Sequence, residues 1–142
     1  MLVNPTLFKL YWGCTALGIA LGLAGVVMGL YFAIAICVLQ TAHYLLRARS
    51  AKAFPVQVRI AFLGLLIAGL WAPLTVIHWI QLVGTTALLL FGYCFLARAL
   101  SLMPWNRSHA LSLGLIRRTI FSAPVKGSIM EARHAPEAAA AA

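Results

Sequence analysis

The sequence predicts an all-α integral membrane protein built from helical hairpins, because it has too few polar residues to cover a soluble globule. Hydrophobic residues make up 63% of the 142 residues and charged residues 9%, whereas soluble domains carry about 25% charged residues. A long apolar ribbon runs from Val56 to Leu102. Backbone polar groups find no water in the bilayer interior, so such a ribbon must be helical or part of a closed barrel. The strand alternation that a barrel needs is missing, which favours helices.

The first apolar run, residues 7–46, is too long for one membrane crossing. As a single straight helix it would extend about 60 Å, twice the bilayer core of roughly 30 Å. We therefore expect two spans, residues 7–23 and 26–46, joined by a turn at residues 22–25, where glycine can adopt the positive φ of a reversal. Together with the hairpin that follows, this gives four transmembrane helices. The alternative is one long tilted helix, which reduces the count to three.

Small residues three and four positions apart in this run predict a flat helix face. They are Gly18, Gly22, Gly25 and Gly29. In lipid, close approach of two backbones at such a face takes the place of the hydrophobic effect. We expect a tight helix contact here, with a partner either within the chain or in another subunit.

The ribbon from Val56 to Leu102 predicts a second hairpin. Its outward limb covers residues 56–71, the turn lies at residues 72–74 around Pro73, and the return limb covers residues 76–102. Trp71 and Trp79 flank the turn, as aromatic anchors at a membrane interface do. Residues 1–107 then form a transmembrane domain. Residues 108–142 form a basic cytoplasmic tail, of which one part lies on the membrane surface or on a partner and the rest is flexible.

Basic residues gather on one side of the predicted membrane. They are Arg47, Arg49, Lys52, Arg59, Arg98, Arg107, Arg117 and Arg118. The positive-inside rule places the loop at residues 47–59 and the C-terminus on the cytoplasmic side of a bacterial inner membrane. We expect these side chains to contact lipid headgroups and to fix the topology. Because topology explains the charge, no nucleic-acid partner is expected.

Two histidines are the candidate ligands for a haem or a chlorin, since neutral imidazole is a common metal ligand. His43 lies near the cytoplasmic end of its span and His78 follows the external turn. The two are therefore at different depths and cannot share one haem. A single-ligand haem or chlorin at either histidine is a minor alternative, and we expect no cofactor.

The polar residues nearest the apolar spans are candidate sites for a ligand or for contacts between helices. They are Gln40, His43, His78, Gln81 and Thr85. His78, Gln81 and Thr85 are three and four residues apart and share one helix face. Such a stripe must face inward or toward a partner, because lipid would leave its polar atoms unpaired. Interhelical hydrogen bonds are one reading, and a bound quinone, lipid or sugar headgroup is the other.

The sequence carries no motif of a hydrolase, metalloprotease or nucleotide-binding enzyme, and its only acidic residues are Glu131 and Glu137 in the tail. We therefore expect no enzyme. The first functional hypothesis is a non-catalytic accessory or assembly subunit of an energy-transducing or redox complex in the inner membrane, which contacts other integral membrane subunits and lipid. The alternative is a small oligomeric transporter or channel whose pathway uses the stripe of His78, Gln81 and Thr85.

Overall fold

The computed structural model describes residues 4–106 and 110–123, and within these residues it contains helices, turns and loops but no strand. The helices are α1 (Pro5–Leu23), α2 (Val27–Ala48), α3 (Phe54–Ala68), the 3₁₀ turn η1 (Ala72–Leu74), α4 (Val76–Phe91), α5 (Phe95–Ser101) and α6 (Leu113–Ile120). Three segments, α1, α2 and η1 with α4, are long and apolar enough to cross a membrane, and α3 is a shorter apolar helix. The all-α membrane fold is confirmed. The terminus expected to be flexible, residues 127–142, lies outside the described residues.

The first apolar run forms two helices, so the alternative of one long helix is excluded. α1 ends at Leu23 and α2 begins at Val27. Gly25 has φ of 101°, in the region that favours glycine, and the Val26 amide donates to the Leu21 carbonyl at 2.9 Å. The reversal at residues 24–26 therefore overlaps the expected turn at residues 22–25.

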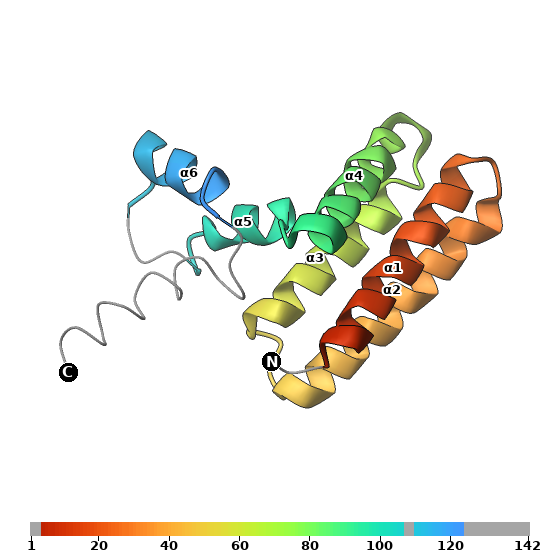
Figure 1. Cartoon of the computed structure of the whole chain (residues 1–142), viewed down its shortest axis with the longest axis horizontal. Helices are drawn as coiled ribbons and strands as arrows, with labels where there is room; N and C mark the ends of the chain where they lie inside the picture. Colours follow the sequence, from red (N-terminus) through yellow and green to blue (C-terminus); the bar gives the residue numbers. More distant parts are fainter. Residues whose placement is uncertain (1–3, 107–109, 124–142) are drawn as a thin grey trace.

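The four apolar helices form an antiparallel bundle. α1 packs against α2 and α4, and α3 packs against α2 and α4 (Figure 1). One end of the bundle carries the α2–α3 loop and the start of α1, and we call it the α2–α3 end. The opposite end carries the α1–α2 turn and η1.

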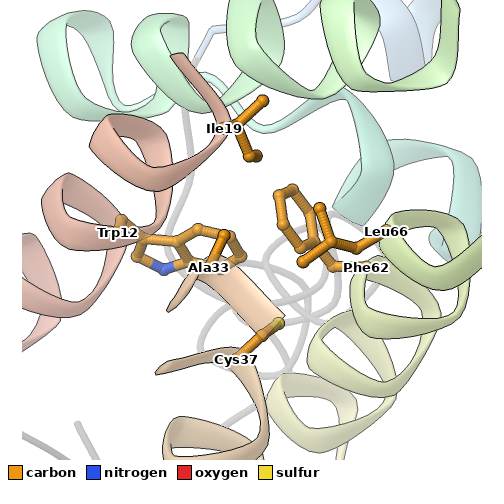
Figure 2. Close-up of a cluster of buried hydrophobic side chains, with 6 residues drawn as sticks. All are labelled: Trp12, Ile19, Ala33, Cys37, Phe62 and Leu66. Atoms are coloured by element: carbon orange, nitrogen blue, oxygen red, sulfur yellow. The ribbon is translucent and has the colours of Figure 1, made fainter. Parts of the chain in front are cut away.

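The core of the bundle is a cluster of apolar side chains from three helices (Figure 2). α1 contributes Trp12 and Ile19, α2 contributes Ala33 and Cys37, and α3 contributes Phe62 and Leu66. The rings of Trp12 and Phe62 meet edge to face, with centroids 4.9 Å apart, the geometry that aromatic quadrupoles favour. The outer faces expose large aliphatic side chains such as Leu39 and Val83, as expected of helices that contact lipid.

The predicted return limb is wrong in one respect, because it is not one helix over residues 76–102. α4 ends at Phe91, Gly92 adopts φ of 69°, and α5 begins at Phe95. A left-handed glycine is a common end for a helix because it has no Cβ to clash. α5 then points to one side of the bundle (Figure 1), where it still packs against α3. With 16 residues, α4 is about 24 Å long against about 33 Å for the 22 residues of α2, so it stops short of the α2–α3 end.

Candidate functional site

The polar stripe on α4 is buried against α3. His78 Nε2 lies 3.0 Å from the Leu66 carbonyl oxygen, and because a carbonyl only accepts, Nε2 carries the proton. Gln81 Nε2 donates to the Phe62 carbonyl at 2.9 Å, and Thr85 Oγ1 donates to the Gln81 carbonyl at 2.6 Å. The structure therefore brings all three predicted residues together and ties them to backbone of the same chain.

The α3 terminus explains why a histidine is needed here. α3 ends at Ala68, and the Leu70 amide donates to Ile67 rather than to Leu66. The last carbonyls of a helix have no helical partner, and His78 supplies one for Leu66. Within the described residues, His78 Nδ1 and Gln81 Oε1 are buried and have no hydrogen-bond partner.

Gly69 gives His78 its space, a role the sequence reasoning missed. A Cβ built at Gly69 would lie 2.6 Å from His78 Nε2, closer than any carbon can approach without movement. The spacing of an isolated glycine after an apolar run offered no signal of this contact.

His43 is separate from the stripe. Its Nδ1 lies 2.8 Å from the hydroxyl of Tyr11 on α1, and the two rings meet edge to face at 5.9 Å. His43 is near the C-terminal end of α2, whereas His78 is near the start of α4. The structure keeps the two histidines apart, in agreement with the different depths predicted for them.

Three of the four predicted packing glycines line the contact between α1 and α2. A Cβ at Gly18 would lie 2.7 Å from the Gly29 carbonyl oxygen, and one at Gly29 would lie 2.6 Å from the Gly18 oxygen. A Cβ at Gly22 would lie 2.3 Å from the side chain of Leu30. Gly25 instead forms the turn and has nothing within 4 Å of its Cβ position. The partner of this glycine face is therefore within the chain.

The predicted headgroup contacts need correction at Arg59 and Arg98. Both side chains are only 3% exposed, so they do not reach lipid headgroups. Arg47, Arg49, Lys52, Arg117 and Arg118 are exposed, and Arg107 lies outside the described residues. The prediction for Arg59 and Arg98 used charge and position alone. These do not reveal the aromatic rings and carbonyls that surround the two side chains.

Arg98 on α5 holds the C-terminal end of α6. Its Nη1 donates to the Thr119 carbonyl at 2.5 Å and to Ser122 Oγ at 2.8 Å, and its Nη2 donates to the Ala123 carbonyl at 2.9 Å. A cation at the negative end of a helix is also favoured by the helix dipole. Tyr93 assists, because its hydroxyl donates to the Ile120 carbonyl at 2.6 Å and its ring lies 4.3 Å from Arg98 Cζ.

Arg59 on α3 faces aromatic rings at the junction of α1, α2 and α3. Its Cζ lies 3.3 Å from the ring centroid of Tyr44 and 5.7 Å from that of Trp12. A desolvated cation–π contact contributes about 2 kcal/mol. Nη1 donates to the Pro55 carbonyl one turn earlier at 2.7 Å, whereas Nε is buried and has no partner within residues 4–106 and 110–123.

Gln40 lies on the same face of α2 as Tyr44, one turn earlier. It is fully buried, and neither its Nε2 nor its Oε1 has a partner among the described residues. Trp12 Nε1 is likewise buried and unpartnered there. Sequence reasoning singled out Gln40 but not Trp12 or Tyr44, because their positions in apolar helices do not distinguish them from any other buried aromatic residue.

The described residues hold no group of three or more histidine, cysteine or acidic side chains placed to bind a metal ion. Cys14, Cys37 and Cys94 are free thiols. Comparison of the chain with models of protein families, with curated proteins and with solved structures finds no match.

Proposed function

We propose that the chain is a non-catalytic accessory or assembly subunit of a bacterial inner-membrane complex, energy-transducing or redox in type, and that α5 and α6 form its docking surface. We call α5 and α6 together the wing. In this proposal the C-terminus is cytoplasmic, other integral membrane subunits and lipid are the partners, and the chain carries no haem, chlorin or other cofactor of its own.

The observation that carries the proposal is that hydrogen bonds and packing hold α6 in a fixed position on α5. α6 has only eight residues, too few to be stable as an isolated helix, yet Arg98 and Tyr93 bind its C-terminal carbonyls and Ser112 caps its first turn. Leu115 and Thr119 are its buried residues, and α6 packs on α5. A short helix held this firmly beside the bundle has a defined outer face.

That outer face combines apolar and basic side chains. Leu113 is 86% exposed and Phe121 is 83% exposed, and Arg117 and Arg118 are exposed between them. Aromatic residues and arginine are enriched in protein–protein interfaces. The exposed faces of α2 and α4 are apolar too, with aromatic side chains such as Phe32 and Phe91 beside the aliphatic ones. What distinguishes the wing is the pair of exposed arginines beside its apolar side chains.

The transporter alternative loses its main support. Its pathway relied on the stripe of His78, Gln81 and Thr85, and the donors of these three residues bind backbone carbonyls within the chain. The stripe packs α4 on α3, which is a structural role of the kind that interhelical hydrogen bonds play in membrane proteins.

Purification from native membranes in mild detergent tests the proposal. The variant Arg117→Ala/Arg118→Ala removes two exposed charges from α6, and Arg47→Ala/Arg49→Ala removes two exposed charges from the α2–α3 end as a matched control. We expect the first pair to lower the recovery of copurifying membrane subunits about tenfold, equivalent to 1.4 kcal/mol, and the control pair to leave it unchanged.

A third variant separates docking from charge. Arg98→Met should release α6 from α5 and lower the same recovery, although Arg117 and Arg118 are intact. Equal recovery for all three variants and the unmodified chain would contradict the proposal. A self-associated colourless dimer or trimer as the sole product would support the transporter instead.

A further inference from the structure

The outer face of α6 is arranged around one arginine. Leu115 and Thr119 are the buried residues of this helix and define its inner face. At about 100° per residue, Arg117 projects about 180° away from the middle of that inner face. Leu113 and Phe121 lie one turn before and one turn after Arg117, each within about 40° of the same direction. We call these three exposed residues the outer stripe.

Helical geometry holds along the whole outer stripe. Ser112 Oγ accepts from the Leu115 amide at 3.1 Å and caps the first turn. The Phe121 amide donates to the Arg117 carbonyl at 3.0 Å, so the helical spacing extends one residue past the end of α6. Successive members of the stripe are therefore about 6 Å apart along the helix axis. Because Arg98 holds the C-terminal end of α6, the stripe is presented on a fixed backbone, which lowers the entropic cost of binding.

Arg118 has different surroundings, although it is adjacent to Arg117 in the sequence. It lies about 100° from Arg117 around the helix, at the flank of the outer stripe. The residues four positions before and after Arg118 are Gly114 and Ser122, whereas Arg117 has a large apolar side chain at both of these positions. Arg118 is therefore a matched control for Arg117, with the same charge and with comparable exposure.

A partner that covers the outer stripe must neutralise Arg117. Covering Leu113 and Phe121 removes water from the guanidinium between them, and a buried cation without a counter-charge is costly. Residues 4–106 and 110–123 of this chain contain no acidic side chain that could supply the counter-charge. Arginine pairs with a carboxylate through two parallel hydrogen bonds. The complementary surface thus has a carboxylate between two apolar patches.

The position of Arg117 disfavours a lipid surface as the occupant. Helices that lie on a membrane bury their apolar side chains and keep their basic residues on the opposite, polar face. In α6 the most outward residue is itself the arginine, so contact of Leu113 and Phe121 with acyl chains would carry the guanidinium into the lipid. A groove in a protein can place a counter-charge at this point, as in the recognition of a helix by a groove.

We propose that the partner subunit receives the outer stripe in an apolar groove that holds an aspartate or glutamate carboxylate opposite Arg117. Leu113 and Phe121 fill apolar pockets on either side, and the ion pair at Arg117 fixes the register of the two surfaces. This inference rests on the proposed function, since it names the chemistry of the surface on which the wing docks.

Copurification of the full chain with its membrane subunits, from native membranes in mild detergent, tests the role of Arg117. The variant Arg117→Leu makes the outer stripe continuously apolar. We expect it to lower the recovery of the copurifying subunits about tenfold, because it leaves the carboxylate of the groove buried and unpaired. Arg118→Leu, the matched control, should leave the recovery unchanged. Both side chains are exposed, so neither change disturbs the packing of α6 on α5.

Carbodiimide coupling identifies the acidic partner. Arg117→Lys places a primary amine on the outer stripe, and a carbodiimide joins an amine to a carboxylate within reach as an amide while the reagent takes up the water released. We expect one crosslinked product, in which peptide mapping by mass spectrometry finds position 117 joined to an aspartate or glutamate of a copurifying subunit. Arg118→Lys should give no coupling to that residue.

Three results would overturn this inference. Unchanged or higher recovery with Arg117→Leu would show a groove that is apolar throughout. Equal losses with Arg117→Leu and Arg118→Leu would show diffuse attraction, such as that of anionic lipid headgroups. Coupling of position 117 to Glu131 or Glu137 would show that the carboxylate belongs to this chain. Arg98→Met separates these results from failure of the proposed function, because only unchanged recovery with Arg98→Met would reject docking through the wing itself.

Discussion

Gly69 and His78 show how a single missing methyl group determines the packing of α4 on α3. The Cβ position at Gly69 is 2.6 Å from His78 Nε2, and that nitrogen donates to the Leu66 carbonyl. Because His78 is only 1% exposed, its ring has little freedom to move away from an added methyl group. The hydrogen bond and the fit of the ring therefore depend on the same residue.

We predict that Gly69→Ala destabilises the fold by about 1–3 kcal/mol, the range typical of overpacking in a core. Gly64→Ala is the matched control, because Gly64 lies in α3, is exposed and has nothing within 4 Å of its Cβ position. It should leave stability unchanged or raise it slightly through helix propensity. Thermal unfolding in detergent measures both, and equal midpoints for the two variants would argue against the contact.

At the residue scale, sequence reasoning identified the grouping of His78, Gln81 and Thr85 because helical spacing alone places them on one face. It could not identify the burial of Arg59 or Arg98. A basic residue near the end of an apolar run usually reaches an interface, and apart from Pro55 and Tyr93 the groups that surround these two arginines are distant in sequence. Thr119 lies 21 residues after Arg98, for example.

The α1–α2 hairpin is the element whose geometry follows most directly from sequence. Residues 7–46 are too long for one span, and glycines supply both the turn at Gly25 and the close approach of Gly18 to Gly29. Backbone contact of this kind leaves no room for a side chain, because the nearest atom to the added Cβ is a carbonyl oxygen rather than a flexible group.

We predict that Gly18→Ala forces α1 and α2 apart and destabilises the hairpin by about 1–3 kcal/mol. Gly13→Ala changes the same helix at a position with nothing within 4 Å of its Cβ and should have little effect. Denaturation in a detergent series gives the difference in the free energy of unfolding. A Gly18→Ala protein as stable as Gly13→Ala would show that the two backbones are not in contact.

The break after α4 is the element that sequence reasoning missed. Residues 76–102 are apolar throughout, and an isolated glycine within an apolar helix is commonly tolerated. What ends α4 at Phe91 is the combination of positive φ at Gly92 with the contacts of Tyr93 and Arg98 to α6. Those contacts are formed only in the folded chain, so no local sequence pattern predicts them.

The whole molecule divides its surface between two chemistries. The bundle uses its glycines and polar stripe for internal packing and turns apolar side chains, aliphatic and aromatic, outward. The wing stands to one side of the bundle (Figure 1) and exposes Leu113 and Phe121 beside two arginines. On this account lipid covers the bundle and another subunit covers the wing.

Site-specific photocrosslinking in native membranes tests this division most directly. The crosslinker replaces Leu113 on α6, which is 86% exposed, or Val83 on α4, which is 68% exposed. The account predicts a crosslinked product of one defined mass from Leu113, lost when Arg98→Met frees α6, and no protein product from Val83. A protein product from Val83 with none from Leu113 would contradict it.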